Sequence, residues 1–238
     1  MVWKVTPLFA EWIASNNFLA DIGYLSSATV ALELGAGVSG IVASTLGPLV
    51  KRYIATDQDY VIRILKQNIS ENLAVPTPLS TRKAAKRKIN SKEKASQHPG
   101  DRPTPCIETL QLDWEADCAA FLPLLLNQGQ TSPNGPSEGD SPSAGVDLVI
   151  ACDCIYNDML IEPFNSICAQ ICRLRSPDQD GKPTMCIIAQ QLRSHEVFES
   201  WLKDFHRSFH VWQVPDKLLT APLRENTGYI VHVGILRQ

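Results

Sequence analysis

The chain has 238 residues and a formal net charge of −3, with 44% hydrophobic and 20% charged residues. This length suits one large α/β domain with a buried core, and the composition is typical of a globular protein. No apolar run of about 18 residues is present, and the first residues lack the pattern of a secretory signal. The seven cysteines show no repeated spacing, which favours reduced thiols in the cytoplasm or the nucleus over disulfides. We therefore expect a cytoplasmic, monomeric protein without a membrane segment.

Positive charge is concentrated in one stretch of the chain. Between Arg82 and Arg102 there are eight Lys or Arg residues and two acids, which leaves a charge of about −9 on the rest. An acidic body disfavours a broad nucleic-acid-binding face and suits a basic protein partner. For the basic stretch itself, a solvated loop is one interpretation, and RNA contact or nuclear localisation is the other.

The predicted elements begin with a helix that Thr6 caps, with Pro7 at its first position. Further along the chain, short apolar runs alternate with apolar residues at helical spacing. Strands are expected at 29–34, 52–56, 107–112, 147–151, 185–189, 209–214 and 228–236, and helices at 38–46, 62–73, 160–174 and after Ser194.

This alternation predicts an α/β fold with a doubly wound, mostly parallel sheet. No helix-length segment separates the last two strands, so we expect them to pair antiparallel. That ending is typical of the seven-strand, Rossmann-like methyltransferase sheet with an antiparallel last strand. The whole chain, 1–238, is predicted to form one domain with two flexible insertions. The first, at about 75–105, is rich in Pro, Ser, Lys and Arg, and the second, at about 127–145, in Gly, Pro, Ser and Asn.

A glycine-rich turn follows the first strand. Gly35, Gly37 and Gly40 match G-x-G-x-x-G, a pattern that lets the backbone approach a ligand and is also found in NAD-binding proteins. Glu33 favours a methyltransferase, because a carboxylate near a bound amino-acid group can contact its ammonium.

Acidic residues also follow the second and third strands. Asp57 can accept both hydroxyls of a ribose, which fits either nucleotide-binding fold. After the third strand, Trp114 could cover an adenine ring and Asp113 could organise its exocyclic amine. A packed tryptophan beside a helix cap is the alternative.

The segment after the fourth strand, Ala151-Cys152-Asp153-Cys154-Ile155-Tyr156-Asn157, is the most informative. Ligands of open α/β sheets bind at this edge, so Asp153 and Tyr156 should lie where a methyl group would emerge. A helix-capping Asp153 is the alternative. Cys152 and Cys154 lack a matching second pair for a metal site, and no metal is expected.

These motifs resemble family 16 of the seven-strand protein-lysine methyltransferases, whose hallmark is Asp-x-x-Tyr after the fourth strand. The chain is most similar to its fungal members that modify a ribosomal protein of the L1 type. The resemblance also rests on Trp3, on the Asp113-Trp114 pair and on the runs 190–194 and 228–234. It implies S-adenosyl-L-methionine as cofactor and a protein lysine as the methyl acceptor.

Within that resemblance, Asp153 and Tyr156 correspond to the catalytic motif. It also implies cofactor contacts from a set of residues spread over the chain: Trp3, Gly35, Ala36, Gly37, Asp57, Trp114 and Cys152. Two departures stand out. Family members carry a substantial segment before the tryptophan that is the third residue here, and alanine is usual at the position of Cys152.

A lysine must lose a proton before it attacks, since its ordinary pKa is about 10.4. A nearby carboxylate raises that pKa and burial lowers it. Asp153 is therefore expected to capture and orient the ammonium rather than to act as a simple base, while Tyr156 presents a ring face to the cationic nitrogen.

Three other functions remain open. Methylation of a nucleic acid or a small molecule is disfavoured because Cys154-Ile155 stands where base methyltransferases carry two prolines. A non-catalytic binding module could keep the fold, and an NAD-dependent dehydrogenase would need a hydride-transfer site that the five histidines do not suggest.

Overall fold

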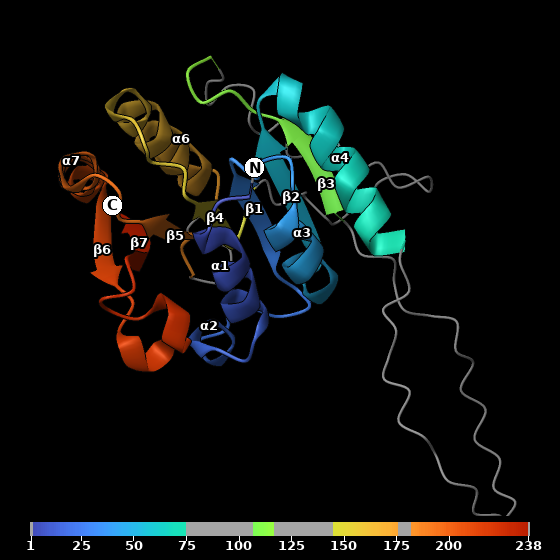
Figure 1. Cartoon of the computed structure of the whole chain (residues 1–238), viewed down its shortest axis with the longest axis horizontal. Coiled ribbons are helices and arrows are strands. Elements are labelled where there is room, and N and C mark those ends of the chain that lie inside the picture. Colours follow the sequence, from blue (N-terminus) through green and yellow to red (C-terminus); the bar gives the residue numbers. More distant parts are fainter. Residues whose placement is uncertain (1, 75–106, 117–144, 176–181, 238) are drawn as a thin grey trace, which may run out of the picture.

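The computed structural model describes residues 2–74, 107–116, 145–175 and 182–237. Almost all of the two predicted insertions, 75–105 and 127–145, lies outside these ranges. Within them the chain forms one seven-stranded sheet in the order β3-β2-β1-β4-β5-β7-β6 (Figure 1). Every predicted strand is present, with bounds that differ by at most two residues. They are β1 Val30–Leu34, β2 Arg52–Asp57, β3 Ile107–Gln111, β4 Leu148–Cys152, β5 Met185–Gln191, β6 Phe209–Gln213 and β7 Tyr229–Leu236.

Strands β1 to β5 pair in parallel, and β7 pairs antiparallel with both β5 and β6. The predicted doubly wound sheet with an antiparallel last strand is therefore confirmed. Strand β1 lies between β2 and β4, so the chain changes direction across the sheet at β1. Open sheets of this kind bind ligands at the carboxyl ends of the strands beside such a switch point.

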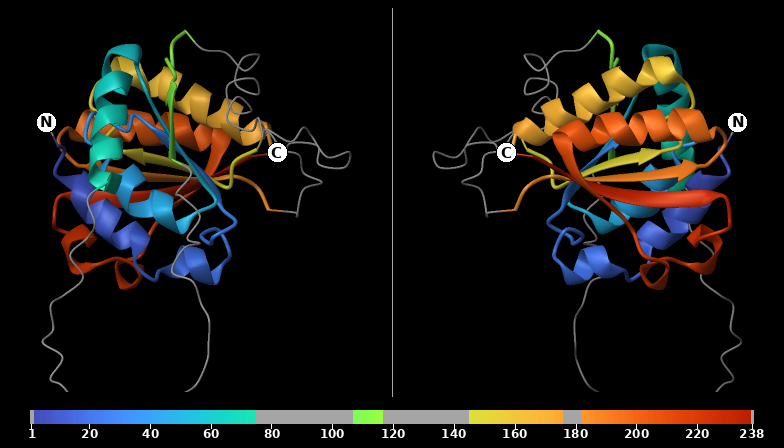
Figure 2. Two further views of the ribbon diagram at one scale, coloured as in Figure 1. Left: turned by 90° about the vertical axis from the view of Figure 1, so that its right-hand side faces the viewer. Right: turned by 90° about the vertical axis from the view of Figure 1, so that its left-hand side faces the viewer.

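Helices cover both faces of the sheet (Figure 2). One face packs against α1, α3 and α4, and the other against α6 and α7. The bounds are α1 Val5–Ala14, α2 Phe18–Asp21, α3 Ile41–Leu46, α4 Asp59–Ala74, α6 Ile161–Arg173 and α7 His195–Ser208, with short 3₁₀ helices at Gly47–Leu49, Asp158–Leu160, Asp216–Leu218 and Ala221–Leu223. Within the described part of the chain, none of these helices has the length and apolar character needed to span a bilayer.

Alternation along the central strands divides the core into two clusters. In β1, Ala31 faces the α1 and α3 side, whereas Leu32 and Leu34 face α6 and α7. Both sets are fully buried, as expected for central parallel strands whose two faces are covered by helices. This double covering holds the loops at the carboxyl ends of β1, β2 and β4 in fixed positions.

The first helix begins earlier than the sequence predicts. Thr6 lies inside α1 and donates its amide to the carbonyl of Trp3 at 3.1 Å, and Lys4 occupies the N-cap position without a side-chain cap. The prediction of Thr6 as N-cap is therefore wrong, because the turn from Trp3 already has helical geometry. Pro7 still falls in the first turn, where its missing N–H costs no hydrogen bond. The predicted cap of α7 is confirmed, since Ser194 Oγ accepts from Val197 N at 3.3 Å.

Candidate functional site

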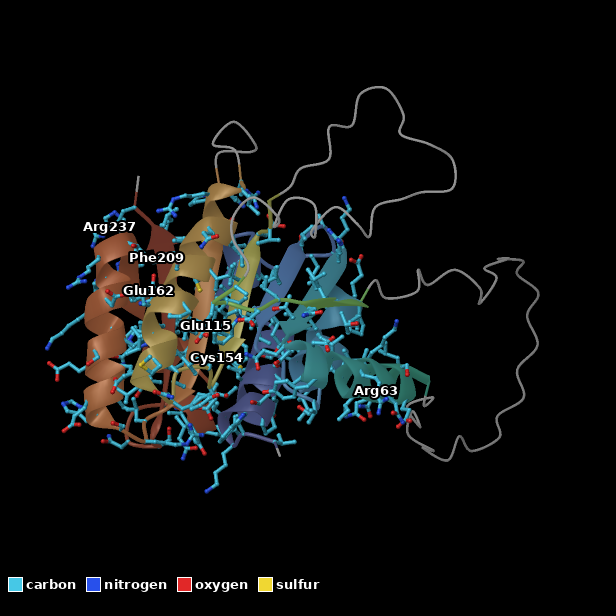
Figure 3. The ribbon with its side chains drawn as sticks, turned by 90° about the horizontal axis from the view of Figure 1, so that it is seen from above. Arg63, Glu115, Cys154, Glu162, Phe209 and Arg237 are labelled. Carbon is cyan, nitrogen blue, oxygen red and sulfur yellow. The ribbon has the colours of Figure 1, made fainter. Side chains whose placement is uncertain are left out.

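A cavity of about 300 Å³ opens at the carboxyl ends of β1 to β4, a size within the range of small-molecule sites. The structure brings most of the predicted site residues together here. Those that line the cavity are Trp3, Gly35, Gly37, Asp57, Asp113, Trp114, Cys152, Asp153 and Tyr156. Glu115 and Cys154, which are labelled in Figure 3, are two further lining residues.

The glycine turn after β1 forms one wall. Gly35 has a φ of 63°, and a Cβ there would lie 2.8 Å from Cys154 Sγ and 3.3 Å from the Trp114 ring. Gly37 has a φ of 65°, but a Cβ there would meet no atom within 4 Å. Gly35 is thus needed both for backbone conformation and for close packing, whereas Gly37 leaves open space for a ligand.

Asp57, at the end of β2, connects this turn to the next strand. Its Oδ2 accepts from Gly37 N at 2.7 Å, and its Oδ1 accepts from Gln58 N at 2.8 Å. Burial raises the pKa of the Asp57 carboxyl, and the two amide donors partly offset that effect. The carboxylate is therefore held in one orientation at the cavity wall, where it could accept further hydrogen bonds from a ligand's hydroxyl groups.

Trp114 closes the side of the cavity next to β3. Its ring lies 5.4 Å from that of Phe164 in an edge-on arrangement and leans against Gly35. The Cys154 thiol is buried nearby and donates to the Leu34 carbonyl at 3.2 Å. Trp114 is packed against the core and also lines the cavity, so its contact with an adenine ring stays a prediction. In the described residues no cluster of His, Cys, Asp or Glu is arranged to hold a metal ion.

Asp153 lies directly after β4 with a φ of 59°, a left-handed conformation that is uncommon for residues other than glycine. Its amide donates to the Ala189 carbonyl at 2.8 Å. The side chain is only 1% exposed and pairs with Arg193 through both carboxylate oxygens. Asp153 was predicted to contact the cationic group of a substrate, and its ion pair with Arg193 was not predicted from the sequence.

Arg193 also contacts Trp3, one of the lining residues of the cavity. Its guanidinium carbon lies 4.8 Å from the centre of the Trp3 ring, and its Nη2 donates to Gln191 Oε1 at 3.0 Å. The Trp3 ring also stacks with Tyr156 at a centroid distance of 6.2 Å. Burial is the main cause of the raised pKa of the Tyr156 phenol, followed by charge interactions with neighbours such as Tyr60.

Two predicted cofactor residues, Glu33 and Ala36, do not line the cavity. Glu33 is buried, and its Oε2 accepts from Tyr53 Oη at 2.8 Å. Burial raises the pKa of the Glu33 carboxyl to about 7. Ala36 is buried and donates its amide to the Thr56 carbonyl at 3.0 Å. Both residues instead contact β2, through Tyr53 and Thr56, and their contact with a cofactor stays a prediction.

Acidic side chains dominate the charge of the cavity. Four carboxylates line it, those of Asp57, Asp113, Glu115 and Asp153, and none of the lining residues that the structure describes is Lys, Arg or His. Such a lining favours a ligand that carries positive charge over one that carries phosphates. Arg193, which pairs with Asp153, is not among the lining residues.

Several contributors to the site, chiefly Arg193, Tyr60 and Glu115, were not predicted from the sequence. Tyr60 is the second residue of α4 and lies three positions after Asp57. Arg193 follows β5, which pairs in parallel with β4 so that Cys152 lies opposite Ala189. That strand adjacency was the signal available, because residues soon after the ends of neighbouring parallel strands meet at one edge of the sheet.

Comparison with known proteins agrees with the fold. No protein-family model matches the chain. A protein of Zygosaccharomyces rouxii named ribosomal lysine N-methyltransferase 5 is 28% identical, and the match covers 95% of this chain and 69% of that protein. The protein of the same name from Vanderwaltozyma polyspora is 29% identical, with coverage of 93% and 71%. Among solved structures, the methyltransferase domain of bacterial CtHen1-CN superposes with a TM-score of 0.52 at 11% identity and covers 98% of this chain and 100% of that one.

The last match supports the fold alone, whereas the first two extend along nearly the whole sequence. The chain thus has the seven-strand, Rossmann-like methyltransferase fold and is a homologue of the proteins named ribosomal lysine N-methyltransferase 5.

Proposed function

We propose that this protein transfers a methyl group from S-adenosyl-L-methionine to a lysine side chain of a ribosomal protein, with an L1-type large-subunit protein as the first candidate. The single observation that carries the choice of cofactor is the acidic cavity beside a glycine turn, where Asp57, Asp113 and Glu115 join the Arg193-paired Asp153. The names of the full-length relatives support lysine in a ribosomal protein as the acceptor.

The lining fits this cofactor in both polarity and shape. Trp114, Leu112 and Val61 supply an apolar wall that suits an adenine ring, and Asp57 supplies acceptors for a ribose. The carboxylates favour the ammonium and sulfonium groups of S-adenosyl-L-methionine and disfavour the pyrophosphate of NAD. Gly37 leaves room for the amino-acid part. When bound, the cofactor would supply a methyl group already activated by the sulfonium charge.

The protein then has to align and prepare the amine. Asp153 accepts a hydrogen bond from the target amine and orients it, and the Tyr156 ring, which is 58% exposed, receives the approaching cation on its face. With the cofactor bound, the lone pair of the neutral amine would form the N–C bond to the methyl group that the cofactor supplies, and the electrons of the C–S bond would stay on sulfur. The proton that lysine loses beforehand goes to solvent. Alignment is the main contribution, because the methyl group needs little further activation.

Calorimetric titration with S-adenosylhomocysteine tests the cofactor, with NAD as the comparison ligand. We expect micromolar binding of the first and none of the second. Transfer of a labelled methyl group to purified L1-type ribosomal protein, mapped by mass spectrometry, then tests the acceptor. Binding without any labelled lysine would contradict the protein-lysine assignment, and label on RNA would indicate a nucleic-acid substrate. Failure to bind either ligand would indicate a non-catalytic module.

A further inference from the structure

The carboxylate of Asp153 already accepts three hydrogen bonds from its own protein. Oδ1 accepts from Arg193 Nη1 at 2.9 Å and from Gln191 N at 3.2 Å, while Oδ2 pairs with Arg193 Nη2. The carboxylate is almost fully buried, whereas the arginine side chain is 35% exposed. The guanidinium therefore covers the carboxylate from the solvent side, in a two-pronged geometry that is among the stronger kinds of ion pair.

This arrangement bears on a requirement of lysine methylation. An unpaired carboxylate next to a lysine stabilises the ammonium form, yet only the neutral amine has a lone pair with which to attack the methyl group. A carboxylate whose charge is cancelled can still accept a hydrogen bond, because it offers about four lone-pair positions. Such a group orients the amine without opposing loss of its proton.

We propose that Arg193 sets the charge of the methyl-transfer site: its guanidinium cancels the charge of Asp153, so that this carboxylate orients the target amine without holding it as an ammonium ion. The inference rests on the proposed function and names a positioning residue for it. Arg193 acts through Asp153 and need not touch the substrate.

The position of Arg193 is fixed by more than one contact. Besides Asp153, the guanidinium meets the Trp3 ring face and the Gln191 side-chain oxygen. Stacking on an aromatic ring and planar, forked hydrogen bonding are both specific to arginine, so lysine is not an equivalent replacement. This distinguishes the pair from exposed surface ion pairs, whose partners move independently.

The other ionisable groups around the cavity cannot replace the guanidinium. From β2 and α4 come Asp57 and Tyr60, and from the end of β3 come Asp113 and Glu115. Tyr156 and the thiols of Cys152 and Cys154 complete the set, and burial is the main cause of the raised pKa values of all three. These three groups stay neutral near pH 7, and the remaining charged groups in the lining are acids. Arg193 is the cation that the structure places on Asp153.

The test compares S-adenosyl-L-methionine, which carries the sulfonium charge, with S-adenosylhomocysteine, which does not. The ratio of their dissociation constants, measured by calorimetry at pH 8, reports the charge near the transfer site without any protein substrate. Arg193→Gln should leave a net negative charge and shift the ratio in favour of the sulfonium by roughly threefold or more. Asp153→Asn should shift it in the opposite direction, and the double variant Asp153→Asn/Arg193→Gln should return it to the wild-type value.

Opposite shifts that cancel in the double variant are not expected from a purely structural effect. Unchanged ratios in single variants that still bind S-adenosylhomocysteine, or shifts in the same direction, would overturn this inference and leave the proposed function standing. A wild-type protein that binds neither ligand would overturn the proposed function itself. Breaking a buried pair can unfold a protein. If Arg193→Gln does not fold, the comparison between Asp153→Asn and the double variant replaces it. A ratio of dissociation constants that does not return towards the wild-type value in the double variant then refutes the inference.

A second readout uses the L1-type ribosomal protein as methyl acceptor. Arg193→Gln should move the midpoint of the pH–rate profile upward by about one unit, because the unpaired carboxylate would stabilise the ammonium form of the target lysine. The double variant should move it back, at a lower rate. A lower rate in Arg193→Gln with an unchanged midpoint would contradict the proposal and would be explained by misplacement of Asp153 alone.

Discussion

The amide of Gly37 donates a hydrogen bond of 2.7 Å to the carboxylate of Asp57. This bond joins the turn after β1 to the end of β2, the two places from which the cofactor would be held. It also means that Asp57 shapes the cavity before any ligand arrives.

Replacement of Asp57 by alanine should therefore weaken the binding of S-adenosylhomocysteine by about 10- to 100-fold, since hydrogen bonds to a charged group contribute about 1.5–3 kcal/mol. Isothermal calorimetry measures the change. Asp59→Ala is the matched control, because Asp59 is exposed, lies two residues away and does not line the cavity. Wild-type affinity in Asp57→Ala would remove this residue from the cofactor site.

Gly35 and Gly37 have the same left-handed backbone conformation but different surroundings. Substitution by alanine at each position therefore separates backbone strain from crowding by the new methyl group. Both substitutions should cost about 1–2 kcal/mol of stability through backbone strain. Gly35→Ala should cost about 1–3 kcal/mol more, because its methyl group would collide with Cys154 Sγ. Gly37→Ala should instead impair ligand binding, since its methyl group enters open space.

Urea unfolding and calorimetry check the two expectations separately. The Cys154→Ala change made together with Gly35→Ala should restore part of the stability, because it removes the sulfur atom that the new methyl group meets. Equal loss of stability in the two single variants would show that crowding at Gly35 is unimportant.

The fold could be predicted because each strand and helix has a local signature. Apolar runs such as Leu148–Cys152 and the capping Ser194 mark elements whatever their partners are. The carboxyl ends of these strands then predict where Asp57, Trp114 and Asp153 meet. Such reasoning needs only strand order and direction.

Partners across the sheet could not be predicted in the same way. Glu33 looks like a ligand-binding acid from its place before the glycines, but its carboxylate accepts from Tyr53 on the neighbouring strand. Arg193 follows a different strand from Asp153. The sequence contains 22 Lys and Arg residues, and nothing in it marks Arg193 as the partner of Asp153. Only packing in three dimensions selects these two pairs.

Glu33 gives a prediction about pH. Its folded-state pKa of about 7 lies above the usual 4.5, so between these values the folded protein binds the proton more tightly than the unfolded chain does. The contribution of Glu33 to the free energy of unfolding is fully present below pH 4.5, where the carboxyl is protonated in both states, and is lost as the pH rises through 7. Glu33→Gln cannot ionise and keeps an acceptor for Tyr53. Its stability relative to wild type should therefore rise over that interval, by an amount on the order of 2–3 kcal/mol.

Thermal unfolding at pH 5 and pH 8 measures this difference. The Glu71→Gln change at an exposed position on α4 serves as the control. Its stability relative to wild type should be the same at pH 5 and pH 8. If Glu33→Gln gained no stability at pH 8 relative to pH 5, the buried carboxyl would have to be compensated by a group other than Tyr53.

Trp3 connects the N-terminal segment to the transfer site, since its ring contacts both the Arg193 guanidinium and the Tyr156 ring. It is 40% exposed, so its removal should cost little stability, about 1 kcal/mol. Trp3→Ala should nevertheless weaken S-adenosylhomocysteine binding several-fold, because it opens one wall of the cavity and frees the two side chains that the ring contacts. Trp3→Phe should retain most of the affinity, and Val2→Ala, at an exposed neighbour outside the lining, should retain all of it. Calorimetry and unfolding measurements on the wild type and these three variants distinguish two outcomes. A loss of affinity that merely follows a loss of stability would assign Trp3 to the core. A loss of affinity in a stable protein would assign it to the cofactor cavity.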